Sequence, residues 1–77
     1  MNEGEEKKGV TGYVEEVLPD SLFRVRMSSE EGGEKPLLLA YLAGKMRLHR
    51  IRVLVGDQVE MVLDPYGGRA RIVRRLT

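Results

Sequence analysis

Basic residues without an acidic neighbour are dense in the segment AGKMRLHRIRV (43–53). They are Lys45, Arg47, His49, Arg50 and Arg52. Cations at this density suit a polyanion, because each phosphate that they neutralise releases condensed counterions. Arginine adds forked hydrogen bonds and planar stacking, which favour RNA. The segment therefore predicts phosphate binding.

Apolar residues are interleaved with these cations. Met46 and Leu48 lie between the basic positions, and Ile51 and Val53 follow them. Such residues usually pack beneath a turn, and less often act as a wedge against a base pair. Both interpretations stay open for Met46 and Leu48.

Enzymatic chemistry is not predicted. His49 is the single histidine, and its basic neighbours offer no carboxylate to orient it as a base. Without cysteine, a thiolate zinc site is excluded, and one histidine makes a transition-metal site improbable. Glu15 and Glu16 are consecutive, so on a strand they would face opposite sides. We therefore expect no catalysis and no cofactor or metal.

The charges are unevenly distributed along the 77 residues. Residues 1–35 hold five Lys and Arg against nine Asp and Glu, a net charge of −4. Residues 36–77 hold eight against three, a net charge of +5, so the whole chain carries +1. One part of the surface could therefore face a polyanion, although a pair of solvated charged faces explains the split equally well.

The length predicts one small domain, with a charged tail at 1–8 and the folded unit at 9–77. The first residues, MNEGEEKKG, lack the apolar stretch of a secretory signal. The longest apolar run, LLLAYLA (37–43), is far shorter than the roughly 20 residues that span a bilayer. A cytoplasmic protein without a membrane segment is expected.

The first half of the chain predicts a hairpin. VTGYVEEV (10–17) is rich in strand formers, with Gly12 as a bulge or a close approach. LPDS (18–21) has turn chemistry. LFRVRM (22–27) alternates apolar and basic residues, as in a half-buried strand. SSEEGGEKP (28–36) then predicts a flexible acidic loop.

The second half predicts three more strands, LLLAYLA (37–43), QVEMVLD (58–64) and RARIVRRL (69–76). GKMR (44–47) predicts a short helical turn, because β-branched residues return at 51–55. This inventory indicates an all-β, five-stranded Greek-key OB-fold barrel with a short helical turn between strands 3 and 4. A small SH3-like barrel is the alternative.

Arginines on two strands could extend the basic surface if the barrel brings them together. They are Arg24 and Arg26 on the second strand, and Arg69, Arg71, Arg74 and Arg75 on the last. Few aromatic residues are available as stacking platforms for single strands, namely Tyr13, Phe23, Tyr41 and Tyr66. The sequence therefore favours recognition of folded RNA and its phosphates.

An ordered set of short motifs covers about residues 9 to 75, and GKMR followed closely by IR and GD is its most specific part. The pieces are Gly12–Val14, Leu18–Pro19, Phe23–Val25, Gly44–Arg47, Ile51–Leu54, Gly56–Asp57, Pro65–Tyr66 and Arg71–Val73. In these motifs the chain resembles the bacterial translation initiation factor one family.

The resemblance implies binding to the A site of the small ribosomal subunit. The loop between strands 3 and 4 would enter the decoding-region helix of ribosomal RNA, where two adenines are displaced. This blocks premature tRNA entry and assists the other initiation factors. The implied partners are this RNA, an adjacent ribosomal protein and those factors, with the chain as a monomer.

The residues that we predict to bind RNA combine the basic segment with the strand arginines. They are Arg24, Tyr41, Lys45, Met46, Arg47, Leu48, His49, Arg50, Arg52, Arg69 and Arg71. In the resemblance, Lys45, Arg47 and His49 lie in the inserting loop, which Met46 and Leu48 shape.

The sequence departs from the family pattern in several places. Tyr41 stands where the family usually has histidine, and Arg50 replaces a usual aromatic residue. The acidic loop 28–36 is longer and the last hairpin is shorter than in the family. Two alternatives remain: a general RNA-binding barrel acting on other structured RNAs, and a module whose acidic loop recruits a protein.

Overall fold

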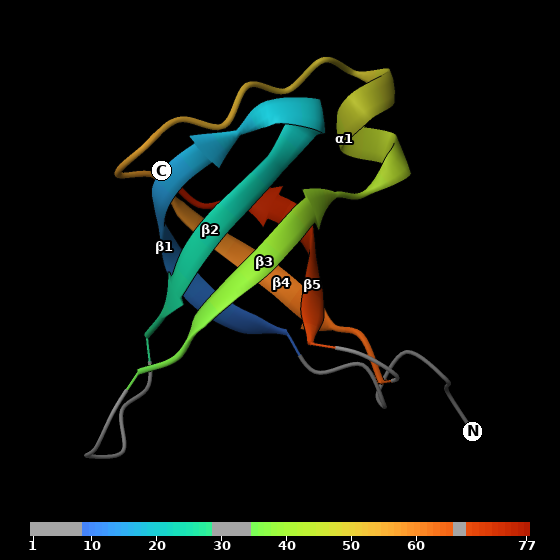
Figure 1. Cartoon of the computed structure of the whole chain (residues 1–77). Coiled ribbons are helices and arrows are strands. Elements are labelled where there is room, and N and C mark those ends of the chain that lie inside the picture. The colour runs from blue at the N-terminus through green and yellow to red at the C-terminus, as the bar shows by residue number, and fades with distance from the viewer. Residues whose placement is uncertain (1–8, 29–34, 66–67) are drawn as a thin grey trace.

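The computed structural model describes residues 9–28, 35–65 and 68–77 (Figure 1). The expected tail 1–8, most of the acidic loop 28–36 and Tyr66 lie outside the described residues. No helix in the described part is long and apolar enough to cross a membrane. The described elements are β1 (Val10–Leu18), η2 (Pro19–Ser21), β2 (Leu22–Met27), β3 (Leu37–Leu42), α1 (Gly44–Leu48), β4 (Gln58–Leu63) and β5 (Arg69–Arg75).

The described strands form a closed barrel in the order β1-β2-β3-β5-β4, and β4 pairs with β1 to complete it. β3 and β5 are parallel, whereas every other pair is antiparallel. α1 lies between β3 and β4 in the chain and at one end of the barrel (Figure 1). The predicted OB-fold barrel with its short helical turn is confirmed, and the strand bounds differ from the predicted ones by one residue at most.

The core follows the alternation of the strands. Its buried members are Val14, Phe23, Val25, Ala40, Met46, Val53, Val59, Met61, Ala70 and Ile72. Val59 and Met61 of β4 are fully buried, but Leu63, two residues further along the strand, is 44% exposed. Leu63 is the last residue of β4, so it extends past the filled part of the barrel.

β1 contains an irregularity that the sequence did not predict. Its register with β2 shifts between Val14 and Glu16, so Glu15 is an extra residue. Both glutamates are exposed and both reach arginines of β2: Glu16 pairs with Arg24 at 3.2 Å, and Glu15 pairs with Arg26 at 2.9 Å. The expectation that these carboxylates face opposite sides is therefore wrong, because a bulge interrupts the alternation.

Gly12 is a point of close approach. A β-carbon there would lie 2.6 Å from the carbonyl oxygen of Arg26, 2.7 Å from Cγ1 of Val25 and 3.1 Å from Cε of Met61. Of the two roles predicted for this glycine, close approach is the one observed. The bulge occurs further along the same strand.

Residues 51–57 cross one end of the barrel without forming a strand, although they are rich in β-branched residues (Figure 1). Val53 is buried and holds the segment to the core. The amide of Gly56 donates to Val14 O at 2.8 Å, and the amide of Val14 donates to Asp57 O at 3.0 Å. Gly56 has φ 95°, a conformation suited to glycine, so the predicted turn at 56–57 is confirmed.

Candidate nucleic-acid interface

One buried side chain holds α1 to the barrel. Met46 is 1% exposed and belongs to the core, whereas Lys45 and Arg47 on either side of it are exposed. The amides of Met46 and Arg47 donate to Ala43 O at 3.0 and 3.1 Å and so begin the helix. Because a helix of five residues is unstable alone, burial of Met46 must stabilise it.

This burial decides the role of two predicted site residues. Met46 lies in the core, so it supports α1 from beneath, as in the packing alternative. At 1% exposure Met46 offers very little surface to a partner, so we expect it to contribute to RNA binding through the position of α1. Leu48 is 75% exposed and is available for contact.

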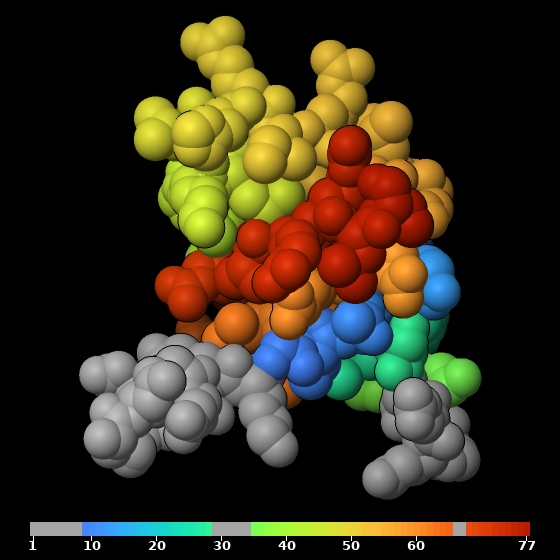
Figure 2. Space-filling view, turned by 180° about the vertical axis from the view of Figure 1, so that it is seen from behind, coloured from blue at the N-terminus to red at the C-terminus, as the bar shows by residue number. Residues whose placement is uncertain are grey.

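The cations of the basic segment are exposed and unpaired within the described structure. Lys45, Arg47, His49, Arg50 and Arg52 form no ion pair with any described carboxylate. In the space-filling view, α1 and the residues after it (yellow to gold) project from the barrel above β5 (red) (Figure 2). The segment can therefore meet an anion without first breaking a described ion pair.

The outer face of β5 continues this cationic surface. Arg69 and Arg71 are exposed, while Ala70 and Ile72 point into the core. Arg71 is in register with Tyr41 of β3, which is half-buried. The register of β3 with β5 thus places Tyr41 beside Arg71, with Arg69 two residues earlier on the same strand.

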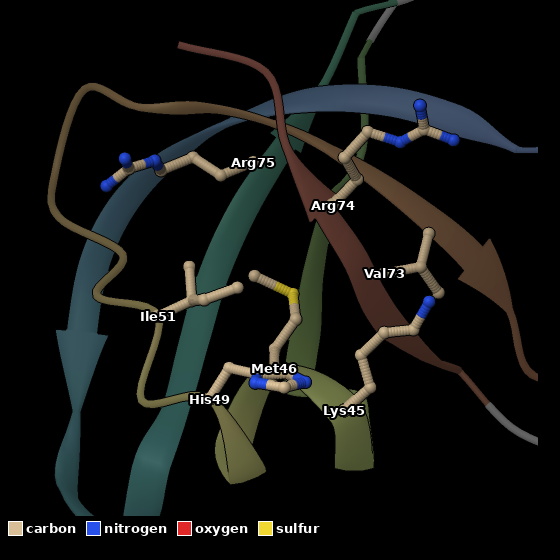
Figure 3. Close-up of a pocket in the computed structure, with 7 residues that line it drawn as sticks. All are labelled: Lys45, Met46, His49, Ile51, Val73, Arg74 and Arg75. Atoms are coloured by element: carbon tan, nitrogen blue, oxygen red, sulfur yellow. The ribbon is translucent and has the colours of Figure 1, made fainter.

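A groove lies between α1 and β5, with a volume of about 310 Å³. Figure 3 shows the Met46 side chain extending from α1 and the Ile51 side chain pointing toward it from the segment after α1, with Lys45 and His49 on the α1 side. The lining residues are Lys45, Met46, His49, Ile51, Val73, Arg74 and Arg75. Apolar side chains therefore form its inner surface, and cations form its rim. Val73 is an extra residue of β5 opposite the step from Glu60 to Met61 in β4, and it lines the groove, so the groove joins the end of β5 to α1.

Two arginines at the groove are held by contacts within the protein. Arg74 pairs with Glu60 at 3.0 Å. Arg75 donates from a terminal guanidinium nitrogen to Arg52 O at 2.8 Å, which fixes the segment after α1 against the end of β5. The sequence predicted that these arginines of the last strand could extend the basic surface. The sequence contains one indication of this groove. It is Val73, an apolar residue among the arginines of the last strand.

Arg24 lies on the same outer face but is already engaged. Arg24 of β2 is in register with Leu39 of β3, and Leu39 is in register with Arg69 of β5. The strand β3 therefore separates the two arginines. Pairing with Glu16 neutralises part of the charge of Arg24, and the two side chains are 57% and 49% exposed, respectively. An ion pair this exposed is worth about 0–1 kcal/mol, so a phosphate could displace the carboxylate.

Comparison with known proteins gives the family. The model of the translation initiation factor 1A / IF-1 family matches residues 1–77. The chain is 47% identical over 72 residues to translation initiation factor IF-1 of Rhodospirillum rubrum, an alignment that covers 92% of this chain and 70% of that protein.

Solved structures agree with this result. The solution structure of translation initiation factor IF-1 from the Wolbachia endosymbiont of Brugia malayi is similar with a TM-score of 0.72 and 28% identity, covering 99% of this chain and 85% of that one. The crystal structure of YjeQ from Thermotoga maritima is similar over 91% of this chain but 23% of its own, with a TM-score of 0.66 and 30% identity. On these matches, the chain belongs to the translation initiation factor 1A / IF-1 family.

Proposed function

We propose that this translation initiation factor binds the A site of the small ribosomal subunit through contacts with ribosomal RNA, blocks premature tRNA entry there and assists the other initiation factors. The observation that carries the proposal is α1. Met46 fixes it in the core, and Lys45 and Arg47 extend from it without a described carboxylate partner. A helix held rigidly in place loses little conformational entropy when it binds.

In this mechanism α1 and residues 49–53 enter the decoding-region helix of the RNA, where two adenines are displaced. Lys45, Arg47 and His49 contact phosphates, and each contact releases counterions. The exposed Leu48 lies against sugar or base surface. The outer face of β5 contacts the RNA beside the insertion through Arg69 and Arg71, next to Tyr41 of β3.

The proposal extends to the whole chain. The barrel, residues 9–77, acts as the RNA-binding unit, with residues 1–8 as a tail. It works in the cytoplasm as a monomer, without a cofactor, beside a ribosomal protein and together with the other initiation factors. Arg24 joins the surface by exchanging Glu16 for a phosphate.

Co-sedimentation with isolated small subunits tests this function. We expect reversal of Lys45 and Arg47 to Glu to weaken binding on the order of several kcal/mol, because lost phosphate contacts are joined by repulsion. Footprinting of the unmodified chain should protect the decoding region. Absence of that protection would defeat the proposal.

A matched pair of single variants separates position from net charge. Arg47→Gln and Arg26→Gln each remove one cation, but Arg26 is paired with Glu15 and lies near the end of β2 away from α1 (Figure 1). Only Arg47→Gln should weaken binding markedly. Equal losses would indicate a response to net charge alone.

The two alternatives give different results in the same experiments. A general RNA-binding barrel would bind unstructured oligonucleotides about as well as small subunits. A similar barrel also makes up 23% of the YjeQ chain, so the barrel alone does not distinguish between these functions. A protein-recruiting module would keep its binding after the Lys45 and Arg47 reversals.

A further inference from the structure

α1 ends in a Schellman motif with an unusual residue at its centre. The amide of Arg50 donates to Arg47 O at 3.1 Å, and the amide of Ile51 donates to Met46 O at 3.0 Å. Ile51 and Met46, which this motif brings together, both line the groove (Figure 3). Arg50 itself has φ 56°, so it occupies the left-handed position that usually belongs to glycine.

Arginine is poorly suited to this conformation. Its β-carbon approaches the following carbonyl oxygen, which is why glycine is the usual residue at such positions. Asp20 and Ser21 also have positive φ, but their short polar side chains can bond nearby backbone. At the other turn of this region the chain uses glycine, with Gly56 at φ 95°. Arg50 therefore stands against the local backbone preference.

The two hydrogen bonds of the motif hold this backbone in place, but the Arg50 side chain takes no part in them. Arg50 is exposed and forms no ion pair with a described carboxylate. A long charged side chain held in a strained position without such a contact is suited to an external ligand. Its position between Arg47 and Arg52, both exposed, makes an anion the matching ligand.

We propose that Arg50 contacts a phosphate of the bound RNA, and that the stability lost through its left-handed backbone is offset by this contact. The inference rests on the proposed function, since Arg50 lies within residues 49–53 of that interface, and it adds a reason for an arginine at this position. It also explains why a residue other than glycine ends α1: the motif sets the backbone, and the side chain serves binding.

Three substitutions at position 50 separate backbone from charge. Arg50→Gly relieves the left-handed strain and should raise the melting temperature by about 4 °C or more. It should also weaken subunit binding about tenfold, with the slope of log affinity against log salt falling by about 0.7–0.9, the value for one lost phosphate contact. Arg50→Asn tolerates the conformation and should reproduce the binding loss.

Arg50→Lys is the conservative control. It keeps the charge on the same backbone, so the salt slope should stay at the parent value. Arg50→Gly that binds with the parent affinity and slope would overturn the inference while leaving the proposed function intact. An unchanged melting temperature in Arg50→Gly would overturn its backbone half. Failure of the unmodified chain to bind small subunits would overturn the proposed function, and this inference with it.

Discussion

The arginines of this protein fall into two electrostatic situations. Arg24 and Arg26 on β2 face carboxylates that the bulge in β1 brings to them. Arg47 and Arg50 have no such partner among the described residues. A free guanidinium meets a phosphate at full charge, whereas a paired one must first exchange its partner. We therefore expect the contribution of each arginine to the proposed RNA binding to depend on its neighbours more than on its exposure.

The pair of Arg26 and Glu15 gives a prediction about pH. Arg26 donates from Nε to Oε2 of Glu15 at 2.9 Å and from a terminal nitrogen to Oε1 at 3.2 Å. These hydrogen bonds lower the pKa of Glu15 below its ordinary value of 4.5. A carboxyl with a lowered folded-state pKa stabilises the protein above its unfolded-state pKa, and this contribution is lost as pH falls through the folded-state pKa.

We therefore expect Arg26→Gln to raise the pKa of Glu15 back toward 4.5. The stability difference between this variant and the parent should be present at neutral pH and should shrink as the pH falls below 4.5. Carboxyl chemical shifts across a pH titration measure the first effect, and unfolding at several pH values measures the second. A Glu15 pKa that stays the same in the variant would contradict the assignment.

At the scale of elements, α1 is a short helix whose position depends on one side chain. Ala43 begins it without a side-chain cap, and the left-handed Arg50 ends it. Of the residues of α1, Met46 is buried, whereas the neighbouring cations Lys45 and Arg47 are exposed. The loss of Met46 should therefore affect both stability and the presentation of the basic residues.

Met46→Ala should lower the free energy of unfolding by about 2–4 kcal/mol, because it removes a fully buried side chain and leaves a cavity. Urea or thermal unfolding measures this loss. Leu48→Ala is the matched control on the same helix, and its stability should change by less than about 0.5 kcal/mol because Leu48 is exposed. Similar losses in both variants would mean that Met46 does not anchor α1.

At the scale of the whole molecule, closure of the barrel depends on β1. Gly12 is in register with Met27 of β2 and with Val59 of β4. A side chain at this point would push against the backbone of Arg26 and the side chains of Val25 and Met61. The space that glycine leaves is therefore part of the way the barrel closes.

Gly12→Ala should destabilise the protein by about 1–3 kcal/mol, since the added methyl overpacks a filled site. In a domain of this size each kcal/mol lowers the melting temperature by about 4–8 °C. Gly44→Ala is the control, because no atom lies within 4 Å of its added β-carbon. A Gly12→Ala variant as stable as Gly44→Ala would contradict the close approach seen here.

The strands, the turns and the basic segment follow from the amino-acid sequence alone. Alternation with a period of two in LFRVRM and RARIV places Phe23 and Ile72 inside and the arginines outside, because neighbouring residues of a strand face opposite sides. The brevity of α1 followed from the return of β-branched residues at 51–55, and the family followed from the order of the motifs. These features depend on residues close together in the chain.

Contacts between distant segments of the folded barrel determine which charges are free and where a groove opens. The bulge at Glu15 shifts the pairing of β1 with β2, and it gives Arg24 and Arg26 their carboxylate partners. The groove joins α1 to the end of β5, which lies much later in the chain. No local pattern encodes these contacts, because they arise when the closed barrel brings distant segments together.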